Sequence, residues 1–215
     1  MKSVLVIGLG RFGTYMARKM QADGHSVMCV DMSEERADAA VNVLHNIEIM
    51  DCREEDVIRT LGVDNCDLCV VAIGDDFQTT LEIVVLLKDL GARRVIARAS
   101  REIHQKLLLR NGADYVVYAE KDMAERLAVR FGMDDIFDYI QLSEDMGVYE
   151  IRTPENWIGK SVAQLNVRAA YHVNILGSKR DDLLTPMIAP DYIFNPEDSL
   201  YVMGDRKHIR KLVHN

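Results

Sequence analysis

Short apolar runs alternate with helix-forming segments through the first 130 residues, and this alternation restricts the fold more than any other feature. Runs rich in β-branched residues predict strands at 3–7, 26–30, 47–50, 68–73, 94–97 and 115–117. Helical spacing of apolar residues predicts helices between them at 12–22, 34–42, 54–61, 77–90, 102–111 and 121–131. Elements in this order predict an α/β fold with a Rossmann-like, doubly wound parallel sheet. Four of the helices are followed by a glycine suited to a left-handed helix end: Gly24, Gly62, Gly91 and Gly112.

The rhythm changes after about residue 140. Short alternating runs at 148–152, 174–178 and 199–203 are separated by Pro154, Pro186, Pro190 and Pro196, which are all the prolines of the chain. This pattern predicts a small α+β domain over 136–215, joined to a first domain over 1–135 through the segment 132–139.

Composition excludes several classes of protein. Hydrophobic residues make up 48% of the chain, enough for a buried core, and the net charge of −8 would repel the phosphates of nucleic acid. The four cysteines show no disulfide pattern, and the pair Cys66 and Cys69 lacks the further ligands of a zinc site, so we expect core thiols in a reducing, cytoplasmic compartment. No apolar run has the length of a membrane span or a signal-peptide core, so work at a membrane would require a partner.

A glycine motif, G-x-G-x-x-G, stands directly after the first predicted strand. Gly8 suits a tight turn, Gly10 lets a phosphate approach the backbone, and Gly13 lets the helix pack closely on the sheet. Asp31 ends the second strand, where a carboxylate can accept from both ribose hydroxyls and would repel a 2′-phosphate. This combination predicts nucleotide binding. The alternative is a turn that binds nothing, with Asp31 capping the helix near Glu34.

Arg11 bears on which nucleotide binds. A guanidinium at the mouth of the glycine loop suits a terminal phosphate, which ATP has and NAD lacks. The alternative is a solvated arginine at a helix start. The ends of the third and fourth strands complete the predicted pocket with Asp51, Cys52, Ala72, Ile73 and Gly74, and Asp75 and Asp76 are predicted to cap the next helix.

No catalytic arrangement of residues is recognisable. The six histidines are scattered, and the chain has no G-x-S-x-G or Walker A sequence. About 75 residues remain for a second domain, fewer than a dehydrogenase usually devotes to its substrate. We therefore expect nucleotide binding to change a conformation and the protein not to be an enzyme. A small NAD-dependent oxidoreductase or NAD(H) sensor is the alternative, and a third possibility is an interaction domain whose nucleotide is only structural.

Five stretches resemble a known family. They are VLVIGLGRFG, VDMSEE, VVAIGDD, GADYVVYAEKDMAERLA and LNVRAAYHVNIL, and they look like the RCK-domain regulatory subunits of Ktr/Trk potassium uptake systems, most of all the Ktr-type (KtrA-like) cytosolic subunit. The resemblance spans the chain, as an RCK N-terminal (TrkA-N-like) and an RCK C-terminal (TrkA-C-like) domain. The chain departs from the family at Ala119, where proline is frequent, and at Arg98, where lysine is common.

The resemblance implies a homodimer that assembles into an octameric ring and docks on a potassium-translocating membrane subunit of the KtrB/TrkH kind, placing the protein on the inner face of the membrane. It also implies gating in which ATP activates and ADP inactivates. The candidate nucleotide-contacting residues are Gly8, Gly10, Arg11, Phe12, Gly13, Asp31, Met32, Asp51, Cys52, Ala72, Ile73, Gly74, Arg98 and Glu120.

Two further sites follow from the same resemblance. Glu120 would face a partner subunit near the γ-phosphates, where two such carboxylates would call for Mg²⁺ or Ca²⁺, and the alternative is an acid that complements a helix dipole. The second domain needs an apolar partner, and dimerisation would create a two-fold cleft. The resemblance implies cyclic di-AMP there, with Arg168 on a phosphate and Val167, Asn174 and Ile175 near the bases; the alternative is a plain dimer face.

Overall fold

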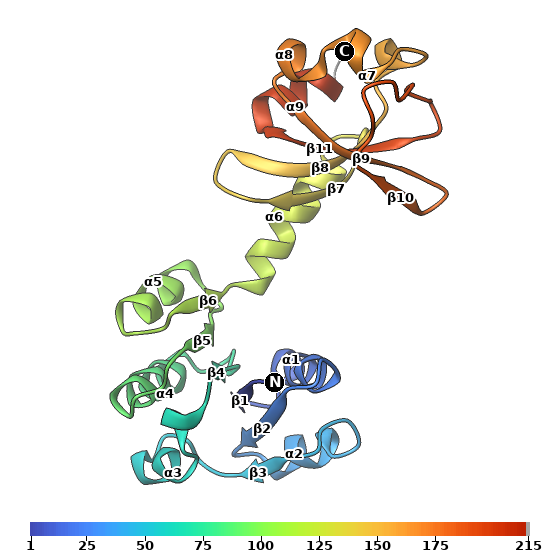
Figure 1. The fold of residues 1–215 in the computed structure, drawn as a ribbon. Coiled ribbons are helices and arrows are strands. Elements are labelled where there is room, and N and C mark those ends of the chain that lie inside the picture. Colours follow the sequence, from blue (N-terminus) through green and yellow to red (C-terminus); the bar gives the residue numbers. More distant parts are fainter. Residues whose placement is uncertain (214–215) are drawn as a thin grey trace. The chain divides into compact units, whose positions relative to one another are not determined.

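The computed structural model describes residues 1–213 of the chain, which forms two compact units, Met1–Glu120 and Lys121–Asn215. The first unit holds a sheet of six parallel strands in the order β3-β2-β1-β4-β5-β6 (Figure 1). The strands are β1 Ser3–Ile7, β2 Ser26–Asp31, β3 Ile47–Ile49, β4 Leu68–Val71, β5 Val95–Arg98 and β6 Tyr115–Val117. The predicted doubly wound fold is confirmed, with the strand order reversing between β1 and β4.

Helices cover both faces of this sheet. They are α1 Arg11–Ala22, α2 Glu34–Ala40, α3 Glu55–Thr60, α4 Phe77–Asp89 and α5 Glu102–Arg110, with a 3₁₀ turn at Val63–Asn65. Alternate residues of β1 point to opposite faces: Val6 packs in one core with Ala17 of α1, and Leu5 packs in the other with Ile83 of α4. The four predicted helix-ending glycines all have positive φ, between +59° at Gly62 and +107° at Gly112.

The second unit is an antiparallel sheet in the order β10-β9-β11-β8-β7. Its elements are β7 Ile136–Gln141, β8 Met146–Arg152, a 3₁₀ turn Glu155–Trp157, α7 Val162–Leu165, α8 Val167–Tyr171, β9 Asn174–Arg180, β10 Leu183–Pro186, β11 Ser199–Asp205 and α9 Arg206–Val213. The buried side chains of Trp157, Tyr149 and Phe194 are the largest in its core. Of residues 1–213, no helix combines the length and apolar character needed to cross a bilayer.

The division between the two domains differs from the sequence prediction in two respects. The segment predicted as a linker, 132–139, contains the first four residues of β7, because Ile136 and Tyr139 are buried and β7 pairs with β8. The compact units divide after Glu120 rather than at residue 135, so most of α6 (Ala119–Phe131) is in the second unit. The reason is packing, since Val129 of α6 contacts the core of that unit.

Candidate nucleotide-binding site

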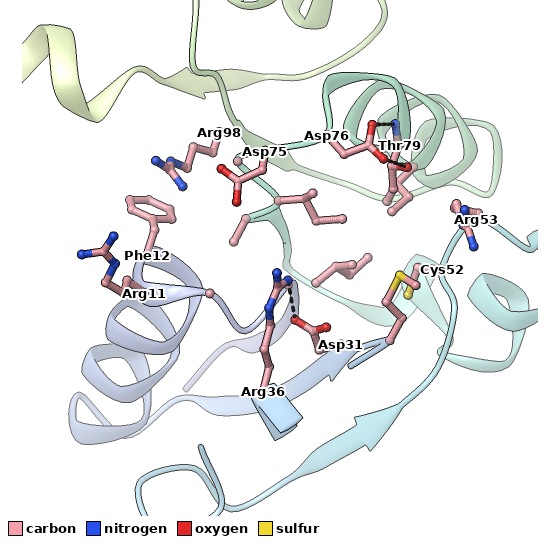
Figure 2. Close-up of a pocket in the computed structure, with 18 of the residues that line it drawn as sticks. Arg11, Phe12, Asp31, Arg36, Cys52, Arg53, Asp75, Asp76, Thr79 and Arg98 are labelled. Carbon is pink, nitrogen blue, oxygen red and sulfur yellow. Dashed lines mark hydrogen bonds and ion pairs between the residues drawn. The ribbon is translucent and has the colours of Figure 1, made fainter. Parts of the chain in front are cut away.

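A cavity of about 830 Å³ lies in the first unit at the carboxyl ends of the parallel strands (Figure 2). Ligands of open α/β sheets bind at this edge, where the strand order reverses. Every residue predicted to contact a nucleotide lines this cavity except Gly13, which is buried in α1. The residues brought together are Gly8, Gly10, Arg11, Phe12, Asp31, Met32, Asp51, Cys52, Ala72, Ile73, Gly74, Arg98 and Glu120.

The glycine-rich loop links β1 to α1. Gly8 has φ +97° and donates its N–H to the Val30 carbonyl at 2.7 Å, so the turn is tied to β2. A side chain on Gly13 would collide with the Gly8 carbonyl, whereas a Cβ atom on Gly10 would meet nothing within 4 Å. The space in front of Gly10, at the N-terminus of α1, is therefore open to an anion.

Asp31 is buried and faces the loop. Its Oδ2 accepts from the Leu9 N–H at 2.6 Å and its Oδ1 accepts from the Ser33 N–H at 2.8 Å. The alternative that Asp31 caps α2 is wrong, because the N-cap is Ser33, whose side chain accepts from the Arg36 N–H. Each carboxylate oxygen accepts a single protein hydrogen bond here, which leaves acceptor capacity toward the cavity.

Four arginines line the cavity, and three of them are paired. Arg36 lies 3.7 Å from Asp31, Arg53 binds Asp51 through two nitrogens, and Arg98 binds Glu120 at 2.6 Å. Within residues 1–213, Arg11 makes no hydrogen bond or ion pair. Figure 2 shows it beside Phe12 on the α1 side of the cavity, while Arg36 reaches Asp31.

An ion pair between Asp51 and Arg53 lies just after the end of β3. Hydrogen bonds from the side chain and backbone of Arg53 lower the pKa of Asp51 below its ordinary value, so this carboxylate stays ionised. Cys52 beside it is buried, and burial raises the pKa of its thiol to about 12. Cys52 therefore lines the cavity as a neutral side chain.

The two acids after β4 have different places. Asp76 is the N-cap of α4 and accepts from the backbone N–H and the hydroxyl of Thr79, so the capping prediction is confirmed for this residue. It is wrong for Asp75, which is exposed at the cavity and outside the cap.

Gly74, which follows β4, and Arg98, the last residue of β5, are neighbours in the cavity wall. A Cβ atom on Gly74 would lie 2.2 Å from a guanidinium nitrogen of Arg98, so a side chain there would displace the guanidinium from this position. In the described part of the chain the buried Nε of Arg98 has no hydrogen-bond partner. Glu120 is exposed on its outer side, and its own backbone N–H together with Arg98 lowers its pKa.

Sequence reasoning missed Arg36 and Arg53. Both follow a strand-terminal acid by a few positions, Asp31 in one case and Asp51 in the other, and this spacing is the signal that would have found them.

The residues predicted to bind a second ligand lie around α8 and β9. Arg168 is exposed and donates to the Asn174 side chain at 2.7 Å. Val167 is buried in the core of the second unit and Ile175 packs against that core, so the Val167 side chain does not face solvent.

The prediction that the cysteines lie in the core is confirmed. Cys29, Cys52, Cys66 and Cys69 are free and buried. Over residues 1–213 no group of three histidine, cysteine or acidic side chains is arranged to hold a metal ion.

Comparison with known proteins gives two domain matches. Residues 4–119 match the TrkA-N domain and residues 148–215 match the TrkA-C domain. The chain is 33% identical over 204 residues to Ktr system potassium uptake protein C of Bacillus subtilis, covering 94% of this chain and 92% of that protein. It is 34% identical over 212 residues to Ktr system potassium uptake protein A of the same organism, covering 98% and 95%.

Solved structures share the fold. The GsuK channel superposes with a TM-score of 0.73 at 16% identity, over 99% of this chain and 39% of that one. The AMP-bound form of the Kef CTD from Shewanella denitrificans superposes with a TM-score of 0.52 at 28% identity, over 60% of this chain and 79% of that one.

Proposed function

The chain belongs to the family of Ktr system potassium uptake proteins, built from a TrkA-N and a TrkA-C domain, and we propose that it gates a potassium-translocating membrane subunit in response to a bound nucleotide. It is a regulator of potassium transport. The proposal concerns the signal: ATP activates and ADP inactivates, and both bind in the cavity at the carboxyl ends of the first sheet.

The proposal that ATP is the activating ligand rests on the unpaired guanidinium of Arg11. The other three arginines of the cavity are each neutralised by an acid, so a further phosphate gains most from Arg11. Charge-assisted hydrogen bonds to phosphate are roughly twice as strong as neutral ones and are frequently bidentate. Arg11 meets the terminal phosphate of ATP, in its own cavity or in that of a neighbouring copy.

The adenosine end is assigned to Asp31. Its remaining acceptor capacity suits the two ribose hydroxyls, and its charge disfavours a 2′-phosphate. The likeness to the AMP-bound Kef CTD supports an adenine nucleotide. Ile73 and Met32 supply apolar surface at the cavity wall for the base.

The proposed gating signal is the one phosphate by which ATP and ADP differ. ATP and ADP share the base, ribose and glycine-loop contacts, so only the γ-phosphate can bind one conformation better than the other. This role needs no bond to be made or broken by the protein, and we propose a binding subunit rather than an enzyme.

Glu120 is proposed to hold a divalent cation, Mg²⁺ or Ca²⁺, together with the same residue of a second copy. Arg98 occupies one side of this carboxylate, and its other side is exposed. A single exposed carboxylate is too few ligands for either ion, so a second copy and phosphate oxygens have to complete the site.

A second ligand, cyclic di-AMP, is proposed at a two-fold cleft of the TrkA-C domain. Arg168 would contact a phosphate, with Asn174 holding its guanidinium and Ile175 nearby. Val167 would contribute only its backbone, because its side chain is in the core.

The assembly we propose is a homodimer that builds an octameric ring on the membrane subunit, at the inner face of the cell membrane. The Ktr system relatives support the partnership, because both match over nearly their whole lengths.

Native mass spectrometry of the purified protein with its bound nucleotide, followed by thermal shifts with ATP, ADP and NADH, tests the proposal. We expect ATP to give the largest shift. The alternative ligand is NAD(H), which the dinucleotide-type strand order and glycine loop also suit. A larger shift with NADH would favour an NAD(H) sensor or a small oxidoreductase. A nucleotide that does not exchange would indicate a structural role.

A further inference from the structure

A groove on the α1 and α2 side of the first unit is lined by arginine and histidine side chains and, within residues 1–213, by no acid. One cavity of about 300 Å³ is lined in part by Arg11, Arg18 and Arg36. A second, of about 490 Å³, is lined in part by Arg18, His25 and His45. Arg18 borders both, so the two cavities adjoin along α1. Of the described residues that line them, none is acidic.

This lack of acids runs against the composition of the chain, whose net charge is −8. Helix α1 carries no acidic residue at all, and the acids of α2, such as Glu35 and Asp38, are outside the lining. Neighbouring Lys19 is paired with Asp23 at 2.7 Å. Arg18, by contrast, makes no ion pair within residues 1–213, and its guanidinium lies over the ring of Tyr15 at 5.5 Å. Of the three arginines that line the groove, Arg36 is paired with Asp31, and Arg11 and Arg18 have no acidic partner within residues 1–213. These two guanidiniums therefore offer unneutralised positive charge in a protein whose net charge is negative.

We propose that this groove docks an acidic, extended segment of a partner protein. Helix α1 has 12 residues, so it is about 18 Å long, the length of about five or six residues of extended chain. Tyr15 is 66% exposed and Val43 is 38% exposed, which provides apolar contacts for side chains that alternate with the acids. The overall negative charge disfavours a long polyanion such as nucleic acid, whose remaining phosphates would be repelled.

Arg18 is the residue that tests the groove. Arg11 and Arg36 also line the nucleotide cavity, so changing them would alter two sites, whereas Arg18 lies outside that cavity. Lys19 is the matched control, because it is the next residue of the same helix, has the same charge and lines neither cavity of the groove.

The experiment measures fluorescence polarisation of a rhodamine-labelled peptide of about six alternating glutamate and leucine residues with the full-length protein. We expect saturable binding that weakens as salt is added. Arg18→Gln should weaken it about threefold to fivefold, the effect of losing an exposed ion pair, and Lys19→Gln by less than about twofold. ATP binding by both variants should equal that of the wild type, so failure of the groove and failure of the nucleotide proposal are separate results.

Three outcomes would overturn the proposal. Equal losses for the two variants would mean that the general field of the surface attracts the peptide. Tighter binding of an oligonucleotide of the same charge would reassign the groove to nucleic acid. Absence of saturable binding at low salt would mean that the groove docks no acidic segment.

Discussion

A Cβ atom on Gly13 would stand 1.9 Å from the carbonyl oxygen of Gly8, so no side chain fits where α1 crosses the end of β1. Gly10, between them in the motif, faces open space. The three glycines of one loop therefore have separable roles: Gly8 takes the positive φ of the turn, Gly13 allows close packing, and Gly10 leaves room for a ligand.

Replacing these glycines by alanine should separate stability from binding. Gly13→Ala forces the loop to move and should lower the free energy of unfolding by about 1 to 3 kcal/mol. Gly10→Ala should cost less than about 1 kcal/mol, since its backbone is ordinary for any residue although alanine is a poorer N-cap than glycine. It should nevertheless weaken ATP binding at least about tenfold by filling the phosphate space. Thermal unfolding with and without ATP measures both. Equal stability losses would contradict the separation.

Arg11→Ala should weaken ATP binding by about 1.5 to 3 kcal/mol, or tenfold to more than a hundredfold, because a charge-assisted contact is lost. ADP and AMP, which lack the γ-phosphate, should bind almost as before. Arg18→Ala, farther along α1 and outside the cavity, is the control and should change none of the three affinities. Isothermal titration calorimetry decides, and equal losses for ATP, ADP and AMP would refute the terminal-phosphate contact.

Glu120→Gln should reduce the dependence of ATP affinity on Mg²⁺ or Ca²⁺, because an amide oxygen is a weaker ligand than a carboxylate. Glutamine can still accept from Arg98, so the cavity wall should be preserved. Glu125→Gln, exposed on the same helix, should leave the ion dependence unchanged. An unaltered dependence in Glu120→Gln would remove the metal proposal.

Cyclic di-AMP should bind the full-length protein at one ligand per two chains, and Arg168→Ala should abolish the calorimetric signal. Lys211→Ala, another exposed cation of the second unit, should have no effect. A flat titration with an intact wild-type dimer would leave this face as an interface alone.

Acid should destabilise the second unit through Asp198. Burial by itself would raise the pKa of Asp198, but Arg180 and the Tyr192 hydroxyl outweigh it, so the pKa lies below the ordinary value. The resulting stability is present above an ordinary aspartate pKa of about 4 and is lost as the pH falls through the lowered pKa.

Asp198→Asn should therefore be less stable than the wild type at neutral pH, and the difference should shrink in acid. Urea unfolding at several pH values, followed by fluorescence of Trp157, the one tryptophan, would measure this. A difference that is constant with pH would assign the loss to packing.

The central strands β1 and β4 could be predicted because each contains a continuous apolar run that is buried on both faces, Val4 to Ile7 in β1 and Leu68 to Val71 in β4. Ala72 and Ile73 were predicted to extend it. They leave the strand instead, and the Thr80 hydroxyl binds the Ile73 carbonyl. Strand β10 was not predicted, because its four residues are all exposed and its sequence does not alternate between apolar and polar residues.

Some residues of the candidate site could likewise be predicted from the sequence, and others could not. The glycine loop and Asp31 were predictable, since their spacing is local and set by the turn from strand to helix. The pairing of Arg53 with Asp51 is also local in sequence, whereas Arg98 and Glu120 are brought together only by the fold. Sequence alone therefore marked Arg11 as a candidate, and only the structure distinguishes it as the arginine of this cavity, within residues 1–213, that is left without an acid.

Each sheet pairs some strands that are close along the chain and some that are distant, since β8 also pairs with β11, as with Arg152 and Ser199. In the second unit, β7 pairs with β8 and β9 with β10 across short turns, as with Arg180 and Leu183. In the first, the central pair β1 and β4 joins Val4 to Leu68. Contacts between residues distant in sequence require an entropically costly loop to close before they stabilise anything, which slows folding. The two hairpins of the second unit should therefore form first, and the closing of β1 against β4 should limit the rate at which the nucleotide cavity forms.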